Sequence, residues 1–248
     1  MTSVAPPCGP SVVPRERLAS GARALGITLS QDQLDHFDAY AAALEVGSRR
    51  FNLTAVTDPV QVAEKHFLDS LTVLSVLPRG ALHLIDVGTG AGFPGLALKI
   101  ARPEISVTLL EATGKKVAWL RETVEMLGLG GLETLAERSE ALAHDPIHRG
   151  RYDIVTARAV APLAVLCELC LPFLRPGGRF IAQKSASGAE FETPAARRAL
   201  SVLGGRVAEV RKVNHAALPN RVLVVIEQNG AVPSAYPRRP GLPAKQPL

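Results

Sequence analysis

The sequence predicts an α/β protein in which a mostly parallel, doubly wound sheet follows an all-helical extension. From residue 82 onward, short apolar runs alternate with segments of helical periodicity, which is the pattern of βα units in a parallel sheet. In the first of these units, a glycine-rich turn separates the apolar run from a helix start. Such a strand, turn and helix is typical of a nucleotide-type cofactor site at the carboxyl edge of a sheet.

The N-terminal part of the chain carries helical signals only. Residues 1–14 contain four prolines and little periodicity, so we expect a disordered tail there. A short helix is expected near residues 16–25, and longer helical patterns follow it. We therefore expect residues 15–80 to form a helical extension, which would suit a substrate-binding cap.

Two helix starts in this extension have specific signals. Ser30 and Gln33 have the spacing of a capping box, in which each side chain bonds to the backbone N–H of the other residue. Asp58 and Pro59 fit the N-cap and the first turn of a further helix, because proline needs no N–H partner there. We therefore expect helices to begin at both places.

The remaining pattern predicts the sheet itself. We expect strands at residues 83–87, 106–110, 132–136, 152–157 and 178–183. Helices are expected at residues 94–101, 114–128, 162–172 and 188–203. The last two apolar segments, 205–213 and 221–228, have no helix between them, so a hairpin with one antiparallel strand should complete a sheet of seven strands. Residues 81–229 would form this domain, and the proline-containing residues 230–248 a flexible tail.

The composition allows a sizeable core and a polyanionic partner. Hydrophobic residues make up 47% of the 248 residues, and the formal net charge is +5. Aromatic residues are only 4%, so a nucleic-acid surface would depend on Lys and Arg more than on stacking.

The three cysteines predict neither a disulfide framework nor a metal site. Cys8, Cys167 and Cys170 are an odd number, and no second Cys or His pair has matching spacing. Cys167 and Cys170 fall in an apolar helical run, so core packing is the favoured interpretation. The start of the chain lacks the pattern of a signal peptide, and no apolar run is long enough to span a bilayer. We therefore expect a cytoplasmic protein that uses no metal and no membrane.

The glycine turn raises the question of which cofactor it holds. Gly90, Gly92 and Gly95 fit the fingerprint of dinucleotide sites, and Glu111 lies about twenty residues further on, where an acid binds a ribose. Asp86 argues against a dinucleotide, because its carboxylate would face a pyrophosphate. S-adenosylmethionine (SAM) has no phosphate and carries two cationic groups that a carboxylate favours. The sequence thus favours SAM, with a dinucleotide and a purely structural turn as alternatives.

Together with the glycine turn, four further motifs resemble the RsmG (GidB) family. They are Phe51-Asn52-Leu53-Thr54, Lys65-His66-Phe67-Leu68-Asp69-Ser70, Gly114-Lys115-Lys116 and Thr156-Ala157-Arg158-Ala159-Val160. The resemblance rests on their joint order and spacing, and it covers residues 16–228. These proteins are bacterial SAM-dependent methyltransferases that modify N7 of one guanine, guanine 527, in 16S ribosomal RNA (16S rRNA).

The resemblance implies a Rossmann-like SAM-dependent methyltransferase fold with SAM as the cofactor. It implies 16S rRNA, the small ribosomal subunit or an assembly intermediate of that subunit as the partner. Glu111 would bind the ribose hydroxyls, and Ser139 with Glu140 would lie beside the adenine. Asp86 would hold either the loop or the ammonium of the cofactor. The full set of expected cofactor contacts is Asp86, Gly88, Gly90, Gly92, Phe93, Glu111, Ser139, Glu140 and Arg158.

Four polar residues are candidates for positioning the target base, namely Arg158, His66, Asp69 and Asn52. His66 and Asp69 are three residues apart on one predicted helix, so they share a face. Asn52 belongs to the preceding loop. Together they either line a guanine pocket or pin the helical extension to the sheet, and the sequence does not separate these roles.

Basic residues predict an RNA-contacting rim. Lys115 and Lys116 open a predicted helix, where cations oppose the macrodipole, so helix stability does not explain them. The expected RNA contacts are Lys115, Lys116, Arg49, Lys65 and Lys184. Collective neutralisation of phosphates would make RNA binding salt-dependent.

No residue is expected to act as a catalytic acid or base. Methylation of a pyrimidine carbon usually needs a cysteine nucleophile, and methylation of an exocyclic amine usually comes with an Asn/Asp-Pro-Pro-aromatic turn. Guanine N7 needs neither, because it carries no proton and can attack the methyl group directly, so positioning supplies much of the rate. A methyltransferase acting on another RNA or on a small molecule, a SAM-binding ribosome-assembly factor and an oxidoreductase remain alternatives. The oligomeric state and the assembly state of the substrate stay open.

Overall fold

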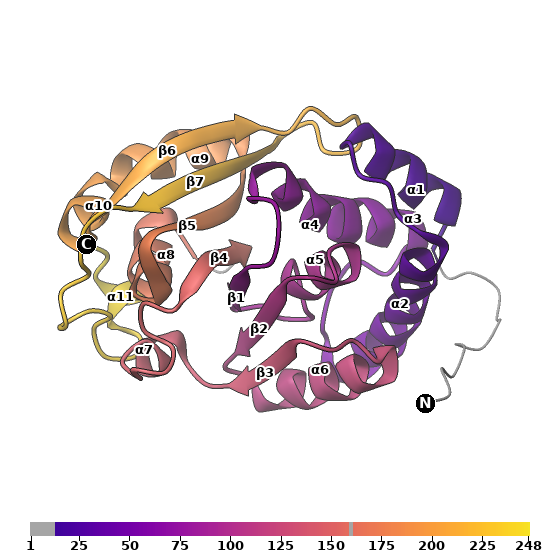
Figure 1. The fold of residues 1–248 in the computed structure, drawn as a ribbon, viewed down its shortest axis with the longest axis horizontal. Coiled ribbons are helices and arrows are strands. Elements are labelled where there is room, and N and C mark those ends of the chain that lie inside the picture. Colours follow the sequence, from indigo (N-terminus) through magenta and orange to yellow (C-terminus); the bar gives the residue numbers. More distant parts are fainter. Residues whose placement is uncertain (1–12, 159–160) are drawn as a thin grey trace.

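A seven-stranded sheet forms the centre of the molecule (Figure 1). Its strands are β1 (His83–Val87), β2 (Ser106–Glu111), β3 (Leu132–Ala136), β4 (Tyr152–Arg158), β5 (Leu174–Ser185), β6 (Gly205–Lys212) and β7 (Arg221–Gln228). They lie in the order β3-β2-β1-β4-β5-β7-β6. Strands β1 to β5 pair in parallel, whereas β7 is antiparallel to both β5 and β6. The predicted mostly parallel sheet with a terminal hairpin is therefore confirmed.

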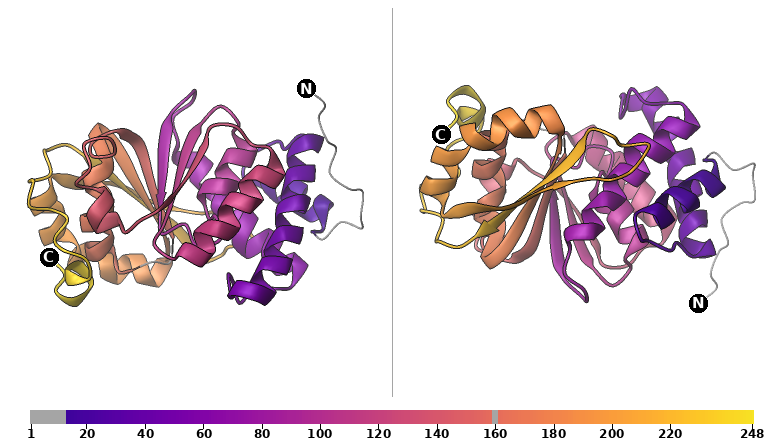
Figure 2. Two further views of the ribbon diagram at one scale, coloured as in Figure 1. Left: turned by 90° about the horizontal axis from the view of Figure 1, so that it is seen from below. Right: turned by 90° about the horizontal axis from the view of Figure 1, so that it is seen from above.

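Helices cover both faces of this sheet, as the two views in Figure 2 show. The computed structural model describes residues 13–158 and 161–248. Within them the helical segments are α1 (Arg15–Ala24), α2 (Gln31–Phe51), α3 (Pro59–Val62), η1 (Ala63–Leu68), α4 (Asp69–Leu71), η2 (Thr72–Val76), α5 (Gly95–Ala101), α6 (Gly114–Leu127), α7 (Ser139–Leu142), α8 (Leu163–Cys170), η3 (Leu171–Phe173), α9 (Ala186–Ala195), α10 (Arg197–Leu203) and α11 (Leu242–Lys245).

Each face of the sheet has its own hydrophobic cluster. Leu84 of β1 belongs to the cluster beneath α2, α5 and α6, and the next residue, Ile85, belongs to the cluster beneath α8 and α10. Successive side chains of a strand point to opposite faces, so a strand buried on both faces must be apolar throughout. This requirement explains the apolar residues Leu84, Ile85 and Val87 before the glycine turn, where the buried Asp86 is the exception.

The helical extension shares the first of these clusters and is not a separate unit. Phe37 of α2 and Phe67 of η1 lie in the same cluster as Leu120 of α6. Helix α2 approaches α6 closely at Gly47, where an added Cβ would collide with the Trp119 indole. The extension is therefore held rigidly against one face of the sheet by apolar packing.

Both predicted helix starts are confirmed. The Ser30 hydroxyl accepts the Gln33 N–H at 3.2 Å, and the Gln33 side chain accepts the Ser30 N–H at 2.8 Å, which completes the capping box. Asp58 Oδ1 accepts the Gln61 N–H at 2.9 Å, with Pro59 as the first residue of α3.

The helical pattern after Pro59 is not a uniform α-helix. Four α-helical residues in α3 are followed by the π-helical η1, by α4 and then by the 3₁₀-helical η2. A π-turn holds one residue more than an α-turn, so it changes which later side chains face the sheet. Sequence periodicity does not reveal this insertion, yet His66 lies within it.

The interpretation of Cys167 and Cys170 as core residues is confirmed. Both side chains are fully buried and form no disulfide. Burial raises the pKa of the Cys167 thiol to about 12, so this thiol is inert at neutral pH. Cys8 lies outside the described residues.

The two expected tails need correction where the structure describes them. Residues 1–12 lie outside the described part, but Val13 is buried in the first cluster. Residues 230–248 pack against α7 and α8 instead of extending into solvent, and Arg238 forms an ion pair with the buried Glu168. The partner lies 70 residues earlier in the chain, so composition alone could not reveal it.

Candidate active site at the carboxyl edge of the sheet

The turn between β1 and α5 requires glycine at three positions. Gly88, Gly90 and Gly92 have φ angles of 69°, 61° and 97°, in the left-handed region that favours glycine. A Cβ at Gly92 would also come within 2.7 Å of the Tyr40 hydroxyl. The Gly88 N–H donates to the Leu110 carbonyl at 2.9 Å, which anchors the turn on β2. The backbone at Gly90 is therefore open to a ligand, whereas Gly92 is needed because Tyr40 packs closely against it.

Asp86 holds this turn together from within. Its fully buried carboxylate accepts the Thr89 hydroxyl at 2.6 Å, the Gly95 N–H at 2.9 Å and the Thr156 hydroxyl at 2.8 Å. Burial raises the pKa of Asp86, and these three hydrogen bonds act in the opposite direction. Of the two roles expected for Asp86, the structure shows the one that holds the loop.

Glu111 lies at the end of β2, beside the turn. One carboxylate oxygen accepts the Gly90 N–H at 3.1 Å, and the other accepts the Thr113 N–H at 2.8 Å. A carboxylate oxygen has two lone pairs, so each oxygen keeps one for a further donor. The side chain is thus fixed in place and can still accept two hydroxyl groups.

Ser139 and Glu140 begin α7, but their side chains turn away from the sheet edge. The Ser139 hydroxyl donates to the Leu169 carbonyl of α8 at 2.6 Å. Glu140 Oε1 accepts the Gly241 N–H at 2.9 Å. If this pair meets an adenine, it does so with backbone groups.

Phe93 lies in a stack of rings rather than at an open surface. Its ring is 4.6 Å from that of His66 and 5.2 Å from that of Tyr40, and both pairs are stacked. The Arg158 guanidinium lies 4.9 Å from the Phe93 ring centroid, within range of a cation–π contact. Tyr40 also donates from its hydroxyl to the Ala91 carbonyl at 2.5 Å, which ties α2 directly to the glycine turn.

Arg158 at the end of β4 shares a buried carboxylate with a second arginine. Arg158 Nη1 lies 3.1 Å from Asp69 Oδ2, and Arg221 Nε lies 2.5 Å from Asp69 Oδ1. Two guanidinium groups therefore face one carboxylate, so the cluster of Arg158, Arg221 and Asp69 has a net positive charge. The side chains of Arg158 and Arg221 are 13% and 26% exposed, so a ligand can still reach them.

Sequence reasoning missed Arg221, although a signal was present. It is the first residue of the last strand and pairs with Ser185 in the antiparallel register of β5 and β7. An antiparallel strand begins at the edge where its parallel neighbours end. Its first residue therefore joins Arg158 at the carboxyl edge.

His66 links the helical extension to Arg158. Arginine can only donate, so the 3.3 Å contact from Arg158 Nη2 makes His66 Nδ1 an acceptor. The proton of the neutral ring is then on Nε2, which donates to the Thr54 hydroxyl at 2.8 Å. Burial, and then the charge of Arg158, lower the pKa of His66 to about 4. The ring is neutral at physiological pH.

The structure brings three of the four positioning candidates together. His66 and Asp69 both contact Arg158, which favours the role of pinning the extension to the sheet. Asn52 instead follows α2 as its C-cap, where its backbone is left-handed with a φ of 50° and its side chain is exposed. Thr54, two residues later in the same motif, is the residue that reaches His66.

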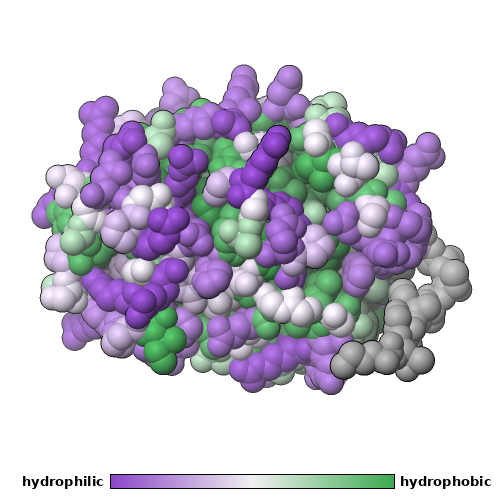
Figure 3. Space-filling model, in the orientation of Figure 1, coloured by the Kyte–Doolittle hydropathy of each residue, from purple (hydrophilic) through white to green (hydrophobic). Residues whose placement is uncertain are grey.

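Four of the five residues expected to contact RNA are accessible to solvent. Lys115, Lys65 and Arg49 are exposed, and Lys116 is half-buried. Hydrophilic residues cover most of the face shown in Figure 3. The expectation for Lys184 is corrected, because its side chain is buried and its ammonium lies 2.7 Å from Glu192 Oε2. An extended strand pattern does not show that the end of β5 is covered by α9.

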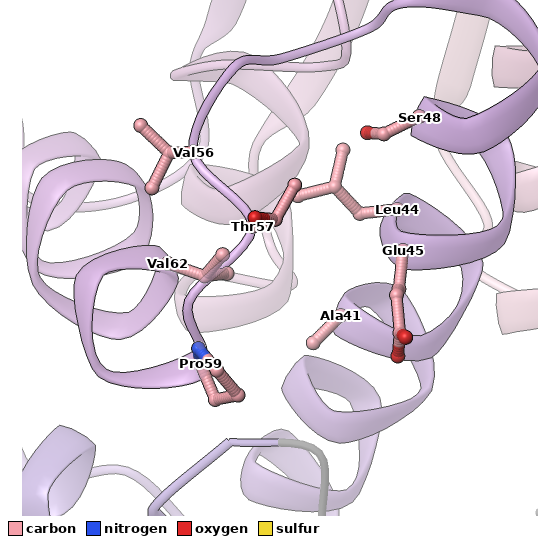
Figure 4. Close-up of a pocket in the computed structure, with 8 residues that line it drawn as sticks. All are labelled: Ala41, Leu44, Glu45, Ser48, Val56, Thr57, Pro59 and Val62. Carbon is pink, nitrogen blue, oxygen red and sulfur yellow. The ribbon is translucent and has the colours of Figure 1, made fainter.

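A small cavity lies in the helical extension, away from the glycine turn (Figure 4). Its volume is about 150 Å³, below the range of roughly 300 Å³ and more that drug-sized ligands occupy. It is lined by Ala41, Leu44, Glu45, Ser48, Val56, Thr57, Pro59 and Val62. This cavity is too small to be the cofactor site.

Residues 13–158 and 161–248 contain no group of three or more His, Cys, Asp or Glu side chains that could hold a metal ion. No helix there is both long enough and apolar enough to cross a membrane.

We expect Asp86→Asn to destabilise the protein by about 1–3 kcal/mol, because an amide has only one oxygen: when that oxygen accepts from Thr89 and Gly95, its N–H groups face the Thr156 hydroxyl, which donates to Asp86 Oδ1 in the native protein. Urea unfolding measures this change. The same substitution at the exposed N-cap Asp58 is the control, since Asn is an equally good N-cap. Equal effects at the two positions would contradict the role given to Asp86.

We expect His66 to make stability fall as the pH drops from 6.5 towards 4. The folded pKa is about 4 and the unfolded value is 6.5, so in this window only the unfolded state takes up the proton. The loss by pH 4.5 should be on the order of 2 kcal/mol. Urea unfolding at several pH values should show a shallower decline for His66→Asn than for the wild type, and equal declines would contradict this role of His66.

The sequence matches a family model described as GidB, rRNA small subunit methyltransferase G, over residues 33–223. Two similar proteins are each described as "Ribosomal RNA small subunit methyltransferase G". The one from Roseiflexus sp. (strain RS-1) is 46% identical over 233 residues, which cover 94% of this chain and 99% of that protein. The one from Dehalococcoides mccartyi (strain CBDB1) is 47% identical over 232 residues, or 93% and 98% of the two chains.

Among solved structures, a SAM-dependent methyltransferase from Aquifex aeolicus superimposes with a TM-score of 0.52 at 19% identity. The match covers 68% of this chain and 93% of that chain. It confirms the predicted Rossmann-like methyltransferase fold, and at that identity it shows the fold alone. Because the family model matches most of the sequence and both relatives match nearly all of it, this chain belongs to the GidB family of rRNA small-subunit methyltransferases.

Proposed function

We propose that this chain is a SAM-dependent methyltransferase that modifies N7 of a single guanine, guanine 527, in 16S rRNA. Membership of the GidB family and the names of its relatives support the substrate class. The observation that carries the proposal is the carboxyl edge, where the glycine turn and Glu111 lie on one side and an arginine pair on the other. The first side suits SAM, and the second suits a polyanion.

The side chains around the glycine turn fit SAM better than a dinucleotide. Glu111 keeps a lone pair on each oxygen, which suits the two ribose hydroxyls. A pyrophosphate at this turn would instead lie close to the carboxylates of Asp86 and Glu111, and like charges repel. When bound, SAM supplies a methyl group on a positively charged sulfur. The proposed cofactor set is Asp86, Gly88, Gly90, Gly92, Phe93, Glu111, Ser139, Glu140 and Arg158, with Asp86 acting through the loop.

The residues at this edge position the reactants and are not needed to exchange protons. Asp86 and Asp69 are occupied by hydrogen bonds and ion pairs, and the Nδ1 lone pair of His66 faces Arg158. Guanine N7 has no proton to lose, so a reaction at N7 needs no general base. Holding N7 in line with the methyl group lowers the barrier by removing translational and rotational freedom.

The basic residues supply the RNA side of the proposal. Arg158 and Arg221 carry two positive charges against the single negative charge of Asp69. This pair of arginines suits a phosphate near the target base. Lys115, Lys116, Lys65 and Arg49 are proposed to contact phosphates further out. The substrate is 16S rRNA, either naked or within the small subunit or its assembly intermediate, and the protein acts in the cytoplasm where that RNA is found.

The proposal predicts the position of methyl transfer. The protein is incubated with methyl-labelled SAM and small ribosomal subunits from cells that lack this enzyme, and the label is mapped on the RNA. We expect label at N7 of one guanine. SAM binding without transfer would favour an assembly factor, and label elsewhere would favour a methyltransferase for another position.

The proposed rim predicts a specific salt dependence. Replacing Lys115 and Lys116 together with Gln should raise KM for the subunit and reduce the slope of log K against log salt by about 1–2, because two phosphate contacts are lost. The affinity for SAM should not change. Arg79→Gln is the control, since Arg79 is exposed and precedes β1 at the opposite edge. An unchanged slope in the double variant would remove these lysines from the RNA interface.

A further inference from the structure

The C-terminal residues 230–248, here called the strap, are fastened to a buried charge on α8. Glu168 is only 1% exposed, and Arg238 is its ion-pair partner. The Arg238 Nε and Nη2 atoms lie 2.9 and 2.7 Å from the two carboxylate oxygens, and the Arg238 backbone N–H donates to the same group at 2.8 Å. A buried carboxylate is costly without its partner, so the strap is bound tightly at this point.

A second set of bonds joins the strap to the loop after α7. Arg149 donates to the Val232 carbonyl at 3.1 Å and to the Tyr236 carbonyl at 2.8 Å. It also donates to the Ala143 carbonyl at the end of α7, at 2.9 Å. One guanidinium thus links the strap to α7, and Figure 1 shows α7, α8 and α11 together at the same end of the molecule.

A third bond reaches the first turn of α7 itself, where Gly241 N–H donates to Glu140 Oε1 at 2.9 Å. Helix α7 has only four residues and no side-chain cap, so local bonds alone hold it weakly. Two side chains hold its start instead. Glu140 accepts the Gly241 N–H of the strap, and Ser139 donates to the Leu169 carbonyl. Both side chains are used as tethers, which leaves the backbone of the pair to face the sheet edge.

We propose that the strap positions the α7 backbone so that it can bind the adenine of the cofactor. This inference rests on the proposed function, in which Ser139 and Glu140 lie beside the adenine. Arg238 and Gly241 are then positioning residues that never touch the ligand. The strap acts on the cofactor side of the sheet edge, so affinity for RNA should not depend on it.

The test compares Glu140→Ala with Glu140→Gln by isothermal titration of S-adenosylhomocysteine and of adenosine. Ala removes the acceptor for the Gly241 N–H, whereas Gln keeps it. Glu140→Ala should weaken both ligands by about tenfold, because without the tether α7 would hold its binding-competent conformation in only about a tenth of the molecules, and the apparent affinity falls by that fraction. Glu140→Gln should recover most of the affinity that Glu140→Ala loses, because its amide oxygen can accept the same Gly241 N–H.

Arg238→Ala extends the test, with the exposed neighbour Arg239→Ala as its control. Arg238→Ala should weaken adenosine binding by a similar factor, and Arg239→Ala should not. If Arg238→Ala does not fold, the comparison of Glu140→Ala with Glu140→Gln tests the proposal without it. Wild-type affinity in Glu140→Ala would overturn the strap proposal, as would equal weakening by Ala and Gln, which would mean that the carboxylate contacts the ligand directly. A wild-type protein that binds neither ligand would overturn the proposed function itself.

Discussion

The buried carboxylate of Asp86 is the interaction on which the carboxyl edge depends. It joins the end of β1 to the glycine turn, to the first N–H of α5 and to β4. A charged group at the centre of a sheet is tolerated only when its lone pairs are satisfied. The three donors therefore fix one conformation of the turn, and the open backbone between Gly88 and Gly92 follows from it.

The helical extension completes this edge from the other side. Tyr40 bonds to the turn, His66 accepts from Arg158, and Asp69 pairs with two arginines. The contacts of His66 and Asp69 are partly buried, and they fix the positions of the two guanidinium groups. An extension that looks separable in the sequence is thus a structural part of the site.

Most of the sheet could be predicted because its signals are local. The strand at residues 132–136 has the expected bounds, and the hairpin follows from two apolar runs without a helix between them. The helix expected at residues 188–203 is instead two helices, α9 and α10, with Pro194 near the end of the first. The π-helical turn in η1 was not predictable, because apolar spacing does not distinguish it from an α-turn.

In the candidate site, too, the local features could be predicted from the sequence and the long-range contacts could not. The sequence by itself determined the glycine turn, its flanking acids Asp86 and Glu111, and the presence of Arg158 at a strand end, because these residues are adjacent to the strands that carry them. Only the tertiary structure decided that Arg221 joins Arg158, that Lys184 is buried, and that Glu140 holds residues 230–248. The reason is physical: these contacts join residues on different elements, and their geometry exists only once the sheet and its helices have packed together.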